Sequence, residues 1–338
     1  MSKGKARKPT SFDVAKLAGV SRSAVSRAFT PSASISAETK DKVTKAASDL
    51  RYRVNLLARG LQQEHSGIVG LVASRLDTPL RSRQVRLLSE RLLRKGFKPM
   101  LITAEQPEML TSLIDSLLSY SIAGMIITSD TPPRALIEDC GRLGLPVVLI
   151  NRAGVTNWGD RVVADNDTGG RLAAQTLIEC GATKLGCLLS RRETYSVSGR
   201  ARAFQEAAAR QGFQTELIHS EDQEYATARE GVLTAGHMAF SRINGLFCAT
   251  DLMALGAMDA IRLDLGLSVP QDVQIIGFDD IEQACWASYD LSTIQQNIDL
   301  QADTVIRMLI ERLEDIDLPR RIERVDLTPV LRGTTRHG

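Results

Sequence analysis

The chain has 338 residues, 43% of them hydrophobic, which is enough for two or three domains with buried cores. No apolar run approaches the ~20 residues of a membrane-spanning helix, and the basic N-terminus lacks the apolar stretch of a secretory signal. The five cysteines show no CxxC spacing, which predicts buried free thiols rather than a metal site. We therefore expect a cytoplasmic, globular protein without a membrane segment or a cofactor.

Charge is divided unevenly along the chain. Residues 1–60 contain 13 Lys and Arg against four Asp and Glu, a net charge of +9. The whole chain has 42 basic and 40 acidic residues, so the remainder carries −7. A basic head on an acidic body predicts that the N-terminal end binds nucleic acid. For the first few lysines alone, a solvated arm is the simpler interpretation.

The first predicted helix begins near residue 10. Thr10 or Ser11 can cap it, because a hydroxyl oxygen accepts a hydrogen bond from an unpaired backbone N–H group. Gly19 supplies the left-handed conformation that ends a helix. Three apolar residues fall on one face at helical spacing: Val14, Leu17 and Ala18.

The second predicted helix is capped by Ser21. Val25 and Phe29 point inward, which leaves the polar side chains of Arg22, Ser23 and Arg27 on the outside. Two short helices joined by a Gly turn predict a helix-turn-helix, whose second helix enters the major groove of DNA.

The third predicted helix runs from Ser36 to about Leu50, and its apolar residues face the first two helices. Residues 55–61 have room for a seven-residue helix, which is too short to persist alone in water.

The motif Asp-Val-Ala-x-x-Ala-Gly-Val-Ser-x-x-x-Val-Ser-Arg, at residues 13–27, resembles the DNA-binding head of the lactose-repressor (LacI/GalR) family. The resemblance continues to the end of the chain. It implies that the second helix and a hinge helix over 55–61 contact DNA. It also implies that Leu61 wedges into the minor groove and kinks the duplex, although a plain linker leucine is the alternative. The implied contacts are made by Ser21, Arg22, Ser23, Arg27, Asn55, Ala58 and Leu61. Val54 stands where the family usually has Pro, which frees one backbone angle.

From Ser66 onward, short apolar runs alternate with amphipathic helical patterns, which predicts parallel sheets covered on both faces. The segment is long for one sheet, so we expect two doubly wound lobes. The predicted strands are residues 67–73, 99–103, 124–128, 146–151, 162–164, 184–189, 215–219, 245–249 and 273–277, with a last strand at 325–332.

The resemblance implies that both lobes have the periplasmic-binding-protein type I fold, so that an all-α head precedes an α/β core. It implies crossings between the lobes near Asp165, near Leu291 and at the last strand. The expected domains are a helix-turn-helix head (1–54), a hinge helix and linker (55–65) and a core (66–338). The N-terminal lobe takes about 66–165 plus 292–325, and the C-terminal lobe takes about 166–291 plus the last strand.

Family matching also places an effector cleft between the lobes, at the C-terminal ends of strands. Arg200 is expected to hold the effector, Asp279 to accept hydrogen bonds from hydroxyl groups, and Tyr225 to stack on a ring. A surface or interlobe ion pair is the alternative for Arg200 and Asp279, and capping of strand ends is the alternative for Ser74, Asn151 and Thr250. The full set of implied residues is Ser74, Arg81, Asn151, Arg152, Asp165, Arg200, Tyr225, Thr250 and Asp279.

Departures from the family pattern bear on the effector. Asn151 stands where several members have Asp, and Thr78-Pro-Leu-Arg81 replaces an aromatic pair. With Arg152 and Arg200 nearby, the cleft is expected to be more cationic than that of a neutral-sugar sensor. Because Arg pairs well with carboxylate and phosphate groups, we hypothesise a sugar acid or sugar phosphate as effector. A neutral sugar, and a purine-type or corepressing effector, stay open.

Two half-sites of a palindromic operator in double-stranded DNA require a dimer, which the family match assigns partly to the helix over 81–95. No heptad tail follows the last strand, so we expect a homodimer. The predicted function is a ligand-responsive transcription regulator, most simply a repressor. A solute-binding receptor would need export. An enzyme would need a phosphate-binding glycine motif, a nucleophile elbow or a metal-binding His pair, and the sequence shows none of these.

Overall fold

The computed structural model describes residues 9–29, 33–52, 66–103, 112, 114, 116–128, 134–152 and 158–336. The contacts divide the chain into two units, Met1–Ser66 and Gly67–Gly338, called the head and the core below. No helix in these described ranges has both the length and the apolar character needed to cross a membrane.

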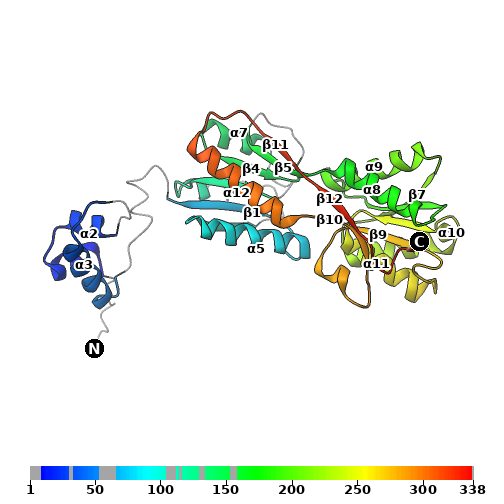
Figure 1. Ribbon diagram of the computed structural model, residues 1–338, viewed down its shortest axis with the longest axis horizontal. Coiled ribbons are helices and arrows are strands. Elements are labelled where there is room, and N and C mark those ends of the chain that lie inside the picture. The colour runs from blue at the N-terminus through cyan, green and yellow to red at the C-terminus, as the bar shows by residue number, and fades with distance from the viewer. Residues whose placement is uncertain are drawn as a thin grey trace. The chain divides into compact units, whose positions relative to one another are not determined.

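The head consists of three helices (Figure 1): α1 (Ser11–Ala18), α2 (Arg22–Ala28) and α3 (Ala37–Asp49). Thr10 and Asp13 form a reciprocal cap, in which the Thr10 backbone N–H donates to Asp13 Oδ2 at 2.8 Å. Gly19 ends α1 in the left-handed region with φ of 66°, as predicted. Ser21 and Ser36 cap the other two helices.

A small apolar core joins the three head helices. It contains Val14, Ala15, Val25, Ala28, Val43, Ala46 and Ala47. Leu17 was predicted to face this core, but its side chain is 53% exposed. Ala15 is buried instead, because the inward stripe of α1 runs through residues 14, 15 and 18.

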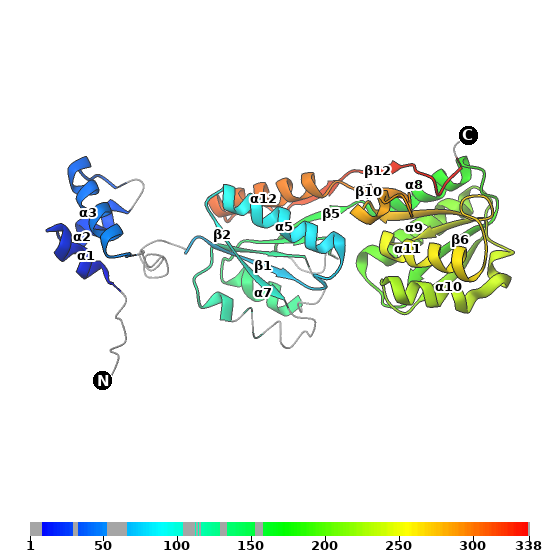
Figure 2. The same cartoon turned by 90° about the horizontal axis from the view of Figure 1, so that it is seen from below.

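The first sheet of the core is parallel throughout, in the order β11-β5-β4-β3-β1-β2. Its strands are β1 (Ile68–Ala73), β2 (Lys98–Thr103), β3 (Gly124–Ile127), β4 (Val147–Ile150), β5 (Asp160–Ala164) and β11 (Ile322–Val325). Helices α5 (Pro79–Arg94) and α12 (Ile298–Glu314) cover one face, and α7 (Arg134–Arg142) covers the other (Figure 2). Burial of the strands on both faces explains their continuous apolar runs.

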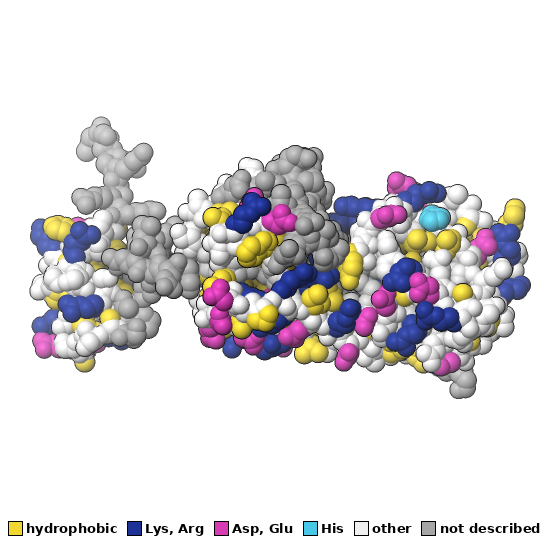
Figure 3. Space-filling model, turned by 90° about the horizontal axis from the view of Figure 1, so that it is seen from above, with side chains coloured by type: hydrophobic (Ala, Val, Ile, Leu, Met, Phe, Trp, Pro, Cys, Tyr) yellow, Lys and Arg dark blue, Asp and Glu magenta, His cyan; other side chains and the backbone are white. Residues whose placement is uncertain are grey.

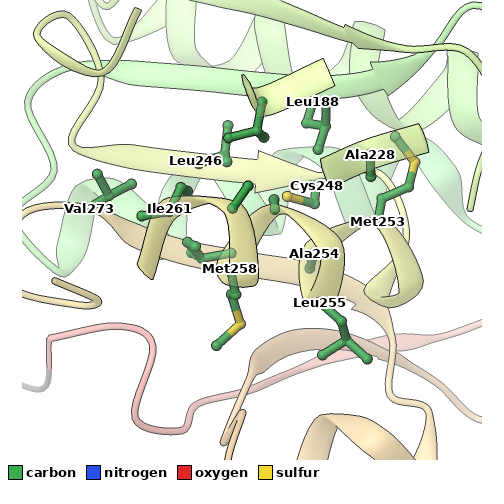
Figure 4. Packing of buried hydrophobic residues seen from close by; sticks show 14 of the residues in the cluster. Leu188, Ala228, Leu246, Cys248, Met253, Ala254, Leu255, Met258, Ile261 and Val273 are labelled. Atoms are coloured by element: carbon green, nitrogen blue, oxygen red, sulfur yellow. The ribbon is translucent and has the colours of Figure 1, made fainter. Parts of the chain in front are cut away.

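The second sheet has the order β12-β10-β9-β8-β6-β7, with only β12 antiparallel to its neighbour. Its strands are β6 (Leu185–Ser190), β7 (Thr215–Ser220), β8 (Gly245–Cys248), β9 (Gln274–Asp279), β10 (Ser292–Gln296) and β12 (Leu327–Val330). Helices α8 (Asn166–Glu179) and α9 (Tyr195–Arg210) cover one face, and α10 (Tyr225–Phe240) and α11 (Asp251–Asp259) cover the other. Figure 4 shows Leu246 and Cys248 of β8 among the side chains of α11.

The described chain passes between the two sheets at Asp165, at Asn297 and at Asp326. The second passage was expected near Leu291. It lies later because β10 pairs with β9 and β12, so residues 292–296 belong to the second lobe rather than the first. The predicted last strand, 325–332, is two strands, because β11 ends in the first sheet and β12 begins in the second. The prediction of two doubly wound α/β lobes is confirmed.

The cysteines are free thiols, of which Cys140, Cys187 and Cys248 are buried. Burial raises the pKa of the Cys187 thiol to about 12. Cys285 is exposed, contrary to the expectation of burial, because it lies in a short 3-10 helix on the surface. The described residues contain no group of three His, Cys, Asp or Glu side chains placed to hold a metal ion.

Candidate functional site

The second helix of the head presents a polar face. Ser21, Arg22, Ser23 and Arg27 are all exposed, while Ala24, Val25 and Ala28 are buried against the other helices. The Ser21 hydroxyl accepts a hydrogen bond from the backbone N–H of Ala24 at 3.2 Å and lies 2.8 Å from the Ser23 hydroxyl. Two arginines therefore extend from a helix whose other face is fixed, which is the layout needed to reach base edges in a major groove.

The remaining predicted DNA contacts, Asn55, Ala58 and Leu61, lie outside the described residues. Two large apolar side chains of α1 are also exposed: Phe12, which was not predicted as a surface residue, at 60%, and Leu17 at 53%. In the space-filling view, basic side chains dominate the described surface of the head, whereas both signs of charge alternate over the core (Figure 3).

A cavity of about 510 Å³ lies between the two lobes of the core. This volume suits a small molecule. Six of the nine predicted effector residues line it: Ser74, Arg81, Asn151, Arg200, Thr250 and Asp279. Its other lining residues include Arg75, Thr78, Gln84, Arg192, Glu193, Thr194, Ser196 and Gln223.

The cavity lies where parallel strands end and helices begin. Ser74 and Asn151 follow β1 and β4, and Asp279 ends β9. The N-terminal residues of α5, α9 and α11 also line the cavity. Each such end presents unpaired backbone N–H groups and a partial positive charge. Three helix N-termini directed at one cavity favour an anionic occupant.

Backbone strain accompanies the cavity. Arg75, Asn151 and Asp279 have positive φ angles of 55°, 50° and 125°, a region that non-glycine residues seldom adopt. All three line the cavity, whereas the other four non-glycine residues with positive φ in the described ranges do not. Strain of this kind tends to gather at ligand-binding sites, so its position supports the assignment of this cavity as the functional one.

Arg200 is the buried arginine that the second lobe adds to the cavity lining, and only 3% of its surface is exposed. Its Nε donates to Asn166 Oδ1 at 3.1 Å, and its Nη1 donates to the Ala249 carbonyl at 2.9 Å and to Asp279 Oδ1 at 3.3 Å. The guanidinium carbon lies 3.6 Å from the centre of the Phe278 ring. Burial lowers the pKa of Arg200, and the charges of Asp279 and Asp251 oppose that shift. These contacts fix the guanidinium in one orientation.

Asp279 connects Arg200 to the other lobe. Gln296 Nε2 donates to Asp279 Oδ1 at 2.6 Å, and Asn151 Nδ2 donates to Gln296 Oε1 at 3.4 Å. Asn151 Oδ1 in turn accepts from the backbone N–H of Ala164 at 2.7 Å. Burial raises the pKa of Asp279, although Arg200 opposes the shift. A continuous chain of hydrogen bonds therefore runs from β4 and β5 to the buried arginine.

Asp251 is a second buried carboxylate behind the cavity. Its oxygens accept from the Thr293 hydroxyl at 2.5 Å and the Ile281 backbone N–H at 2.9 Å. Burial and the neighbouring charge of Asp279 raise the pKa of Asp251 to about 7. No sequence pattern predicts that Asp251 and Asp279 lie together, because they come from different elements, α11 and β9.

Arginines of both lobes meet at the cavity. Arg81 Nη1 donates to Gln84 Oε1 at 2.8 Å, and its charge, like that of Arg200, opposes the rise in the pKa of Asp279 caused by burial. Arg75 Nη1 of the first lobe donates to Asp222 Oδ1 of the second lobe at 2.6 Å, and Arg192 Nη1 lies 3.2 Å from Asp222 Oδ2. Four arginines therefore line the cavity, against the two carboxylates of Glu193 and Asp279.

Three predicted effector residues do not line this cavity. Tyr225 does not stack there, because its hydroxyl donates to Asp259 Oδ2 at 2.5 Å; this bond, with burial, raises the pKa of Tyr225 to about 12. Asp165 caps α8 by accepting from the Thr168 backbone N–H at 3.3 Å. Arg152 is placed away from the cavity lining, and its carbonyl accepts from Arg161.

The residues that sequence analysis missed are Arg75, Arg192 and Gln223. Arg75 follows Ser74 directly at a strand end, and Arg192 lies two residues beyond β6. The rule that ligands bind beyond the carboxyl ends of parallel strands points to both positions.

Comparison with known proteins gives two family matches. Residues 12–55 match "Bacterial regulatory proteins, lacI family", and residues 174–335 match "Periplasmic binding protein-like domain". The chain is 29% identical to the sucrose operon repressor of Pediococcus pentosaceus, over 91% of this chain and 93% of that protein. It is 28% identical to the HTH-type transcriptional repressor PurR of Aliivibrio fischeri, over 95% and 97% of the two chains.

Among solved structures, the lac repressor dimer bound to operator and the anti-inducer ONPF superposes with a TM-score of 0.88. The match covers 98% of this chain and 100% of the other at 24% identity, a level that supports the shared fold.

Proposed function

Because this chain belongs to the LacI family of DNA-binding transcription repressors, we propose that a small anionic effector, bound between its two core lobes, controls its affinity for an operator. A sugar acid or a sugar phosphate fits the cavity's volume and combines hydroxyl groups with a charged group. The effector is a regulatory ligand and not a substrate.

The charge of the cavity carries this proposal. Four arginines against two carboxylates leave a formal charge of +2 on the lining residues. Arg200 and Asp279 satisfy each other in part. Arg75 and Arg192 are paired with Asp222, which lies outside the lining, so their charge reaches a ligand only in exchange for Asp222. Arg152, on which the sequence argument partly relied, does not line the cavity, and Arg75 and Arg192 supply that charge instead.

On DNA, we propose a homodimer that places one α2 helix in each of two successive major grooves, with Arg22 and Ser23 as the main base readers and Arg27 as a third. Residues 55–61 of the two chains fold together on the operator, and Leu61 enters the minor groove. The effector acts by preferring one arrangement of the lobes. It induces if that arrangement disfavours the hinge, and it corepresses if that arrangement favours the hinge.

The test of effector class is a thermal-shift panel on the purified full chain. The panel pairs each acid with its neutral counterpart: galacturonate with galactose, and gluconate and glucose 6-phosphate with glucose. Hypoxanthine and guanine complete it. A ligand at 100 times its dissociation constant stabilises the protein by ~2.7 kcal/mol, which is readily detected. A shift only with acids or phosphates supports the proposal, and a shift with a neutral sugar or a purine refutes it.

A matched pair of variants tests whether the cavity is the site. Arg81→Gln removes a cavity charge from α5, whereas Arg94→Gln makes the same change at an exposed position on the same helix. We expect Arg81→Gln to weaken binding of the identified acid by about tenfold or more, since charge-assisted hydrogen bonds contribute ~1.5–3 kcal/mol. Arg94→Gln should leave it unchanged. Equal affinities in the two variants would place the effector elsewhere.

The DNA proposal is tested on an operator selected from a random-sequence duplex pool. Arg22→Ala should relax base preference at one position of each half-site, at a cost of ~1–3 kcal/mol. Leu61→Ala should weaken specific binding while leaving non-specific binding intact. Lys45→Ala, which removes an exposed charge of α3, is the control and should change affinity by a similar factor on all sequences. If Arg22→Ala behaves like Lys45→Ala, the proposed base contact is wrong.

A further inference from the structure

The carboxylate of Asp222 is held by two arginines from opposite lobes. Its Oδ1 accepts from Arg75 Nη1 at 2.6 Å and from the backbone N–H of Gln223 at 2.6 Å, and its Oδ2 accepts from Arg192 Nη1 at 3.2 Å. Arg75 also reaches Glu224 at 3.4 Å. The side chains of Arg75 and Asp222 are 18% and 23% exposed, so water screens this pairing only in part.

Both arginines belong to the cavity. Arg75 and Arg192 line it, together with Gln223 and the α9 residues Thr194 and Ser196, whereas Asp222 does not. Gln223 Nε2 lies 3.4 Å from Thr194 Oγ1, which ties the Asp222 loop to the start of α9. One end of the cavity thus holds two guanidinium groups and a helix N-terminus, and a carboxylate of the protein occupies the guanidinium groups from outside.

We propose that Asp222 stands in for the acidic group of the effector, which takes over Arg75 and Arg192 when it binds. The inference rests on the proposed function and deepens it, because it assigns the acidic group to one end of the cavity. The other polar cluster of the lining, Arg200 with Asp279, is then left to the hydroxyl groups of the same molecule. A carboxylate and a phosphate both fit, since each offers two oxygens to two guanidinium groups.

The exchange makes Asp222 an internal competitor that lowers the affinity of the cavity for anions. A neutral molecule cannot replace its charge, and such a molecule would leave the two arginines paired as they are. An anion competes with Asp222 for the two arginines. Its apparent affinity is therefore its intrinsic affinity multiplied by the fraction of molecules in which Asp222 has already released the arginines. Because Arg75 and Arg192 come from different lobes, the incoming anion restores the same bridge between them.

The test uses the full chain and inorganic phosphate as the probe. Phosphate binding is measured by thermal shift and calorimetry, with chloride as the reference salt at constant ionic strength. Asp222→Asn keeps an oxygen for the Gln223 backbone N–H but removes the competing charge. We expect Asp222→Asn to bind phosphate about tenfold more tightly than the unmodified chain. The double variant Asp222→Asn with Arg192→Gln should lose that gain.

Two controls separate competition from general electrostatics and from misfolding. Glu221→Gln removes one negative charge at the exposed neighbouring position and should change phosphate affinity by less than about twofold. Asp222→Glu retains a carboxylate and should show no gain. If Asp222 is only a structural tie between the lobes, Asp222→Asn will melt earlier and bind phosphate no better, and the inference is overturned.

The results of this experiment distinguish a failure of the exchange from a failure of the proposed function. If the effector panel identifies an acid but Asp222→Asn gains no phosphate affinity, the anionic effector stands and the exchange is wrong. If the panel identifies a neutral sugar, the anionic effector is refuted and the exchange with it, and a gain of phosphate affinity in Asp222→Asn that requires Arg192 then shows only that the two arginines can bind an anion.

Discussion

Two glycines beside the cavity should respond oppositely to the same substitution. Gly170 lies in α8, where an added Cβ would lie 2.3 Å from the Arg200 carbonyl oxygen and 2.8 Å from the Phe204 backbone nitrogen. Both atoms belong to the backbone of α9, so the helix itself must move. Gly199 lies in α9, where the nearest atom to an added Cβ is Asn166 Cβ at 3.4 Å, an ordinary contact.

The expected magnitudes follow from these distances. In a helix, replacing Gly by Ala is favourable by ~0.5–1 kcal/mol where space exists. Gly199→Ala should therefore stabilise the core by about that amount. At Gly170 the same gain is opposed by overpacking, which costs ~1–3 kcal/mol. With backbone atoms closer than 3 Å, the upper part of that range applies, and Gly170→Ala should destabilise the core by ~1–2 kcal/mol.

The assay is urea unfolding of the full chain followed by circular dichroism, with the midpoints compared at equal slopes. Affinity for the identified effector should also fall in Gly170→Ala, because α9 carries Arg200 and the cavity residues Thr194 and Ser196 lie at its start. A midpoint of Gly170→Ala that rises, as that of Gly199→Ala is expected to do, would show that α9 can move away from α8 at little cost, and the argument for a rigidly positioned Arg200 would fail.

Three further predictions concern buried or partly buried polar groups. Burial alone would raise the pKa of Asp160, but hydrogen bonds from Arg312 and Arg321 outweigh it and lower the pKa. Asp160→Asn should therefore cost ~3–5 kcal/mol at pH 7, and pH-dependent unfolding should show the difference shrinking below about pH 4. Asp251 has a raised pKa of about 7, so the unmodified chain should lose stability relative to Asp251→Asn as the pH rises from about 4 to about 7; a difference independent of pH would contradict this. Tyr225→Phe should lower the free energy of unfolding by ~1 kcal/mol through the lost bond to Asp259 and leave effector affinity unchanged. A tenfold loss of effector affinity, measured by calorimetry, would show that Tyr225 does contact the effector.

The sequence was sufficient for the head because its rules are local. Caps at Thr10, Ser21 and Ser36 and a left-handed Gly19 each depend on a few neighbouring residues. The exception is Leu17, which helical spacing places near the apolar stripe. Whether such a residue is buried depends on where α3 packs, and spacing within α1 carries no information about that contact.

The position of the cleft was predicted, but not all of its lining residues, because contacts between distant elements cannot be derived from local sequence patterns. Family matching located six of the nine residues, and the cavity lies at the carboxyl edges of the parallel strands, as the sheet order predicts. Tyr225 was misplaced because its distance from the cavity depends on a hydrogen bond to Asp259, 34 positions away in the chain. Arg75 and Arg192 matter through one partner, Asp222, and no pattern in the sequence joins these three residues.

The hydrogen bonds of the cleft explain how an occupant can act on the lobes. Gln296 is the last residue of β10 and precedes the passage at Asn297, and it bonds both Asp279 of the second lobe and Asn151 of the first. A ligand whose hydroxyl groups occupy the acceptor sites of Asp279 competes with Gln296, so it changes a tie at the point where the chain crosses. At the other end of the cavity, an acidic group that replaces Asp222 keeps Arg75 and Arg192 bridged. Binding would thus alter one link between the lobes and preserve another, which favours a rotation of the lobes over their separation. If that rotation also changes operator affinity, linkage requires operator DNA to change effector affinity by the same factor.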